Sequence, residues 1–177
     1  MGNNFQEGPL GVVRLTYDGV DMGKTLGDTT IEFIEDITDI FYAQDGTQPA
    51  DKVPTGQAYQ ITCQIAELNL TRLEKINRGT TKAGDSMKYG RNLYISLRDN
   101  AKVLKVARVD SDGVASTDPH YIQTWYTASP TISNGAVMFG PDSQRYIEIT
   151  FYIFYSDTHG AFGYQGVASS VGLTPVS

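Results

Sequence analysis

Residues 29–42 (TTIEFIEDITDIFY) alternate apolar and acidic side chains over more positions than an ordinary strand contains. Such a period of two is typical of a strand with one packed face and one hydrated face. At about 3.3 Å per residue the segment would span roughly 45 Å if it were extended throughout. A second alternating segment, residues 57–68 (QAYQITCQIAEL), follows a polar stretch. Two strands of this length indicate a subunit that contributes a ribbon to a larger wall, and they would be out of proportion in a compact enzyme.

The same alternation predicts further strands on both sides of the long pair. Residues 11–17 and 20–25 are expected to form a hairpin joined at Asp18-Gly19, a strong signal for a tight turn. Gly27-Asp28 is expected to break the chain before the long acidic strand. The later strands are expected at residues 92–98, 102–109, 121–127 and 145–155. The chain is therefore predicted to be mainly β.

Residues 70–78 form the single short helix that the pattern predicts. Thr71 and Glu74 have the spacing of a capping box, and apolar side chains recur at every third position. Gly79 is well placed to end the helix.

The remaining stretches are polar and lack a period. Residues 43–56 (AQDGTQPADKVPTG) are expected to be a long loop of the kind that carries function. Residues 80–90 and 128–143 are also expected to be irregular. Residues 156–177 are poor in charge and rich in Gly and Ser, so we expect a C-terminal arm after a single domain of residues 1–155. Removing such an arm is expected to leave the β fold intact.

Length and composition fit one domain with a real core. The 177 residues are 40% hydrophobic and 19% charged, and no apolar run approaches the roughly 20 residues of a membrane span. We therefore expect no membrane insertion. Cys63 is the only cysteine, and the N-terminal residues lack the features of a signal peptide, so synthesis in a reducing cytoplasm is expected.

The net charge of −6 conceals strong segregation along the chain. Residues 1–70 hold eleven acids and three bases, residues 71–108 hold ten bases and three acids, and residues 109–177 hold six acids and one base. One interpretation is that these charges coat hydrated faces. The other is that a basic segment of one copy meets an acidic segment of the next, which would set register and association rate.

No motif for catalysis or for a metal emerges. Gly23-Lys24-Thr25 lacks the spacing of a phosphate loop, and the Asp-rich residues 110–118 lack the glutamate that a calcium loop needs. The two histidines, His120 and His159, have no metal-ligand neighbour at helical or strand spacing. We predict no catalytic residue, no metal site and no cofactor.

The two long strands carry a usable pattern of faces. In the second strand the odd positions around Cys63 are apolar, which predicts a buried thiol. Ile34 and Ile40 interrupt the even face of the first strand. Matching the two strands places five polar side chains on one hydrophilic surface: Glu32, Asp36, Gln60, Thr62 and Gln64. Long exposed strand edges are an aggregation hazard unless neighbouring copies pair with them.

This order of elements resembles the tail tube (major tail) proteins of long-tailed bacteriophages. The similarity rests on the hairpin at Asp18-Gly19, the long strand that opens at residues 27–32 (GDTTIE), the long loop, the return strand, the helix at residues 70–78 and a late pair of strands. It covers nearly the whole chain and rests on order and texture, with no diagnostic motif.

The resemblance implies two packed antiparallel sheets with a helix at their side. It implies hexameric rings whose long hairpins join into an inter-subunit β-barrel, and rings that stack into a virion tube through which DNA passes without specific binding. The implied partners are further copies, the tail initiator or distal tail, the tape measure and the tail terminator proteins. The lumen candidates are Glu32, Asp36, Gln60, Thr62, Gln64 and Glu148, joined by Thr150 and Tyr152, and the inter-ring candidates are Asp45, Asp51 and Lys52. The C-terminal arm is a further inter-ring candidate.

Two other classes stay open. Another virion component, such as a distal tail or decoration protein, would form a single ring or remain a monomer. A carbohydrate-binding β-sandwich would need exposed aromatic side chains that converge on a groove, and Trp125, Tyr126 and Tyr121 are the candidates for it.

Overall fold

The computed structural model describes residues 12–42, 49–66, 69–90, 94–109, 112–134 and 146–173. Its strands are β1 (Val13–Tyr17), β2 (Val20–Ile40), β3 (Asp51–Ile65), β4 (Thr80–Ala83), β5 (Ser86–Tyr89), β6 (Lys102–Arg108), β7 (Ile122–Asn134), β8 (Ile147–Ile153) and β9 (Gly163–Gln165). Its helices are α1 (Leu70–Ile76) and the 3-10 turns η1 (Pro119–Tyr121) and η2 (Ala168–Val171). The mainly β fold with one short α-helix is confirmed.

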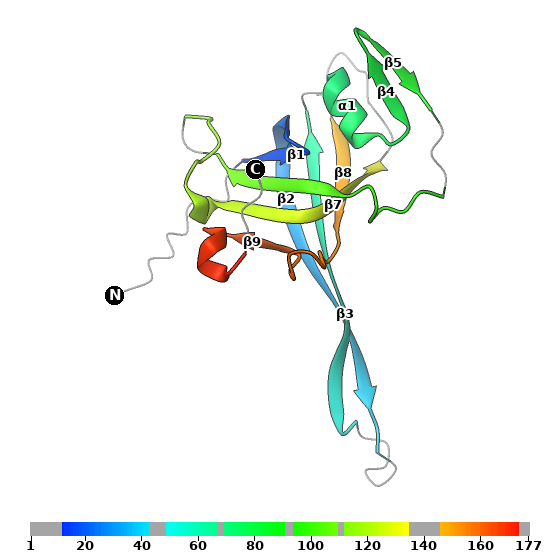
Figure 1. Cartoon of the computed structure of the whole chain (residues 1–177), viewed down its shortest axis with the longest axis vertical. Coiled ribbons are helices and arrows are strands. Elements are labelled where there is room, and N and C mark those ends of the chain that lie inside the picture. The colour runs from blue at the N-terminus through cyan, green and yellow to red at the C-terminus, as the bar shows by residue number, and fades with distance from the viewer. Residues whose placement is uncertain are drawn as a thin grey trace.

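Seven strands form one antiparallel sheet that folds over on itself. Their order is β6-β1-β2-β3-β8-β7-β9, and an additional pairing between β6 and β7 joins the two ends of the first six strands. Figure 1 shows β6 and the first part of β7 running across the direction of β2, β3 and β8. The two layers therefore pack at an angle, while β4 and β5 form a separate small hairpin beside α1.

The core lies between these layers. Leu15, Ile61, Cys63, Ile149 and Phe151 are all fully buried and belong to one cluster. The expected burial of Cys63 is confirmed, and this burial raises the pKa of its thiol to about 12. A thiol with that pKa stays protonated at neutral pH and is therefore inert as a nucleophile.

The first hairpin forms as predicted, but β2 does not end where the sequence indicated. Asp18 and Gly19 both have positive φ, 49° and 75°, as a tight two-residue turn requires. The expected break at Gly27-Asp28 is wrong, because β2 runs on to Ile40. Pairing with β3 continues through a register shift between Leu26 and Thr30, where β2 has more residues than its partner strand. Gly27 lies within this shift and has φ 63°.

The expected loop at residues 43–56 is shorter than predicted, because β3 begins at Asp51. Pro54 lies within this strand although proline lacks a backbone N–H. β8 pairs with β3 only from Tyr59 onward, so Pro54 lies on an edge where no ladder hydrogen bond is lost. Residues 43–48 lie outside the described part of the chain.

The helix is confirmed, but its cap is a different residue. The side chain of Asn69, and not that of Thr71, accepts the backbone N–H of Arg72 at 2.8 Å. Glu74 instead accepts the backbone N–H of Lys82 at 2.9 Å, which ties β4 to α1.

The polar stretches between the later strands also differ from expectation. The expected loop at residues 80–90 contains the β4–β5 hairpin. The expected strand at residues 92–98 is absent from its described part, residues 94–98, where Tyr94 has φ 63°. The irregular segment expected from residue 128 begins later, because β7 continues through Pro130 to Asn134. Sequence alone could not show that this part of β7 is paired on one side only.

The C-terminal segment is part of the body. Within residues 156–173, β9 pairs with β7, and the Phe162 ring packs 5.2 Å from Tyr59. His159 stacks on Tyr126 at 3.8 Å between ring centroids, and its Nδ1 lies 2.9 Å from the Ser156 hydroxyl. These residues therefore pack on the body, and the expectation that the segment can be removed without loss of the fold stays a prediction.

Candidate assembly surface

The β2–β3 hairpin extends well beyond the body and is the most prominent feature of the molecule (Figure 1). β1 pairs with β2 only as far as Lys24, and β8 pairs with β3 only between Tyr59 and Ile65. Among the described residues, no strand covers the outer edge of β2 from Thr25 onward. The outer edge of β3 is likewise uncovered before Tyr59. The hairpin thus presents two open edges to its surroundings.

One face of the hairpin and of the adjoining β8 is polar. Cross-strand partners share a face, so the register decides which side chains lie together. Gln60 lies opposite both Glu32 and Tyr152, whereas Thr62 lies opposite Thr150 with 3.2 Å between the hydroxyls. The six predicted lumen residues therefore lie on one face: Glu32, Asp36, Gln60, Thr62, Gln64 and Glu148. Between Thr25 and Ile40 of β2, and along β3 and β8, no Lys or Arg shares that face, whereas Lys24 at the body end of β2 does, since Leu26, two residues on, lies opposite Gln64.

Ile34 and Ile40 stay on this polar face. Ile34 lies opposite Ala58, two residues from the Glu32–Gln60 pair, and Ile40 lies opposite Asp51. The register shift between Asp36 and Ile37 changes the alternation in β3 and leaves that of β2 intact. Both isoleucines are half-buried, so the polar face contains two apolar interruptions.

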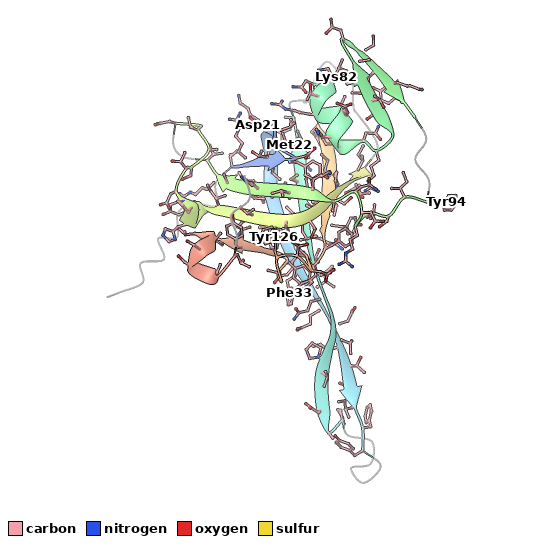
Figure 2. All side chains as sticks on the ribbon, in the orientation of Figure 1. Asp21, Met22, Phe33, Lys82, Tyr94 and Tyr126 are labelled. Atoms are coloured by element: carbon pink, nitrogen blue, oxygen red, sulfur yellow. The ribbon has the colours of Figure 1, made fainter. Side chains whose placement is uncertain are left out.

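The opposite face of the hairpin carries large apolar side chains in water. Phe33 is 49% exposed, Ile37 is 57% exposed and Phe41, just beyond β2, is 56% exposed. Figure 2 shows Phe33 where the hairpin leaves the body. We call Phe33, Ile37 and Phe41 the apolar stripe. An exposed apolar series on a projecting ribbon is typical of a surface that another molecule covers.

The two acidic residues on the apolar side have partners on the neighbouring strand. Glu35 accepts a hydrogen bond from the Gln57 amide at 3.2 Å, and Asp39 forms an ion pair with Lys52 at 3.0 Å. Lys52 therefore projects on the apolar side, away from the polar face. Asp51 accepts the backbone N–H of Lys52 at 2.7 Å, while Asp45, the third inter-ring candidate, lies outside the described residues.

An aromatic cluster fixes the base of the hairpin. Tyr59 packs at 5.0 Å from Phe33, 5.1 Å from Trp125 and 5.2 Å from Phe162, measured between ring centroids. Sequence reasoning missed this cluster because its members come from four separate strands or turns. Phe33 and Tyr59 sit at alternating apolar positions, whereas Trp125 and Phe162 carry no such local signal. The cluster joins the projecting hairpin to the body.

The aromatic groove that a carbohydrate-binding module would need does not form. Trp125 is part of the hairpin base, Tyr126 is buried against His159, and Tyr121 packs under the Arg108 guanidinium at 5.3 Å. These three aromatic side chains face different neighbours and do not converge.

Part of the basic segment serves the fold itself. Lys75 pairs with Asp18, and the Arg72 guanidinium donates to the Asp21 carbonyl at 2.8 Å. The Asp21 carboxylate accepts from Arg14, and this hydrogen bond lowers the pKa of Asp21. These contacts link α1 to the β1–β2 turn.

The described residues contain no group of three metal-ligating side chains. Within the same ranges, no helix combines the length and the apolar character needed to cross a membrane. What the arrangement offers is open strand edges and two contrasting faces.

No protein-family model matches the sequence, and no curated protein matches it. Among solved structures, a chain in the cryo-EM structure of the anti-feeding prophage baseplate, 6-fold symmetrised, is similar. The identity is 9%, the TM-score is 0.38, and the alignment covers 82% of this chain and 88% of that one. A likeness at this level carries no conclusion about function.

Proposed function

We propose that this chain is a virion structural protein, a tail tube subunit whose copies form hexameric rings that stack into a DNA-conducting tube. The single observation that supports this most is the β2–β3 hairpin, which leaves the body with both edges open (Figure 1). A free edge can accept a strand from another chain, and closure into a ring removes all such edges.

The two faces of the hairpin suit different neighbours. In the proposed ring the apolar stripe packs against the adjacent subunit, and the polar face with Glu32, Asp36 and Gln60 lines the channel. Duplex DNA binds Lys and Arg strongly through its phosphates, so a conducting wall should lack them. A wall of carboxylates and amides repels or ignores the phosphate backbone. From Thr25 to Ile40 of β2 and along β3 and β8, the described polar face carries no Lys or Arg, and this supports the assignment.

Electron microscopy of the purified protein at two concentrations tests the assembly, together with light scattering on the same samples. Hollow tubes support the tail tube. Single rings that never stack would favour the alternative of a distal tail component. A protein that stays monomeric at both concentrations, even with preformed tube ends added, would contradict the proposal.

The channel assignment has a separate test. Asp36→Lys adds a cation to the polar face without touching the core, so particles carrying it should assemble and eject DNA more slowly. Asp85→Lys, the same charge change at the exposed β4–β5 turn, is the matched control. Equal ejection rates for the two variants would remove the polar face from the channel.

A further inference from the structure

A second open edge lies on β7. β6 pairs with β7 from Ile122 to Ala128, whereas β8 pairs with β7 from Ala128 to Asn134. Beyond Ala128, the side of β7 that faces away from β8 has no strand partner among the described residues. The four-stranded wall β2-β3-β8-β7 thus has open backbone at both ends.

Arg78 covers this β7 edge. Its guanidinium donates to the Pro130 carbonyl and, at 3.0 Å, to the Thr131 hydroxyl. Arg78 lies one residue after the C-cap Asn77 of α1, and the buried Ile76 at the end of the helix holds the turn in place. Partial burial lowers the pKa of Arg78, but an arginine stays charged at neutral pH.

Arg78 binds the β7 edge at a residue that has only one backbone group available for pairing. Pro130 has no backbone N–H to offer an incoming strand, so its carbonyl is the pairing group at that residue. Arg78 occupies that carbonyl. A strand that pairs with β7 here must displace the guanidinium or offer it a better acceptor.

The open β2 edge of a second copy carries such an acceptor. Glu32 lies on the uncovered part of β2 and is exposed. A hydrogen bond from a guanidinium to a carboxylate is stronger than one to a neutral carbonyl. Transfer of Arg78 from Pro130 to an incoming carboxylate would compensate for opening the edge.

We propose that Arg78 is a removable cover on the β7 edge, which restrains single subunits from pairing until the acidic β2 edge of a second copy displaces it. This inference rests on the proposed function, since it needs copies that assemble through their strand edges. The cover would restrain pairing at the β7 end of the wall until the β2 edge of another copy arrives.

The test measures the lag of assembly by light scattering on the full chain, for wild type, Arg78→Ala and Arg78→Lys. Removing the cover should shorten the lag several-fold, and the lysine variant should be intermediate because its compact, strongly hydrated ammonium lacks the planar, pre-organised geometry of the guanidinium. Hydrogen exchange on the monomers should show faster exchange in residues 129–134 for Arg78→Ala. Arg98→Ala, which removes a guanidinium from the Tyr155 carbonyl and Asp157, is the matched control and should leave the lag unchanged.

Thr131→Val removes one acceptor and leaves Arg78 in place, so it provides a second route if Arg78→Ala does not fold. Unchanged lags for Arg78→Lys and Thr131→Val in a wild type that forms tubes would overturn the cover and leave the proposed function standing. Failure of every variant and of wild type to assemble, with tube ends supplied, would instead overturn the proposed function and the cover with it.

Discussion

Replacing Ile37 by serine should weaken assembly without harming the subunit. Ile37 lies opposite Pro54 on the projecting part of the hairpin, outside the core, and is 57% exposed. Full burial of an isoleucine side chain stabilises by about 1.5–3 kcal/mol, so covering the exposed 57% in an interface contributes roughly 1–2 kcal/mol. Because about 1.4 kcal/mol corresponds to tenfold, the critical concentration for assembly should rise roughly 5- to 30-fold.

The assay is the protein concentration that remains in the supernatant after assembled material is sedimented. Ile37→Leu keeps the apolar area at the same position, so its critical concentration should stay near that of wild type. Thermal unfolding of the monomers should be alike for all three proteins. The reasoning fails if Ile37→Ser assembles at the wild-type concentration, because the apolar stripe would then be uncovered in the assembly.

Two further predictions concern the subunit alone. Asn69→Ala should cost about 1 kcal/mol and lower the melting temperature by about 2–4 °C, whereas Thr71→Ala should leave it nearly unchanged, since Asn69 is the helix cap; equal shifts in calorimetry would contradict this. Burial raises the pKa of Cys63 and of Tyr17 to about 12, from 9.0 and 10.0. Their contribution to stability is therefore complete below pH 9 and is lost as the pH rises towards 12. The melting temperature should fall as the pH is raised from 9 towards 12. Rapid reaction of the native Cys63 thiol with a disulfide reagent at pH 8 would contradict the raised pKa of this thiol.

Alternation along the chain predicted the parts of the fold where one face is buried and the other hydrated. The long strand around Phe33, its return around Cys63 and the tight turn at Asp18-Gly19 all follow from local pattern and turn chemistry. The errors occur where pairing in space overrides a local signal. Gly27 reads as a break in the sequence, but pairing with β3 absorbs it as a register shift. Pro54 reads as a loop residue, but an open edge tolerates it.

The polar face of the hairpin could also be predicted from alternation, whereas the long-range contacts that support the hairpin could not. Period-two alternation places Glu32 and Gln60 on one face, and the observed register puts them directly opposite each other. The aromatic cluster at Tyr59 and the contact between Arg78 and Pro130 join residues 26 to 103 positions apart, so no local pattern could reveal them. Long-range packing, and not local preference, decides how the hairpin is held and how the β7 edge is covered.

A projecting ribbon with open edges and an apolar face is a hazard for a single subunit, because it can pair with any similar ribbon. Three features of this hairpin and its wall reduce that hazard. Pro54 interrupts the donors of the β3 edge, and Arg78 occupies an acceptor on the β7 edge. Glu35 and Asp39 place charges within the apolar side, each held by a neighbour on β3. None of these features closes the open edge of β2, which also carries Glu32. In the proposed assembly, this free edge would supply the carboxylate that engages Arg78 of another copy, so each contact would run from β2 of one subunit to β7 of the next.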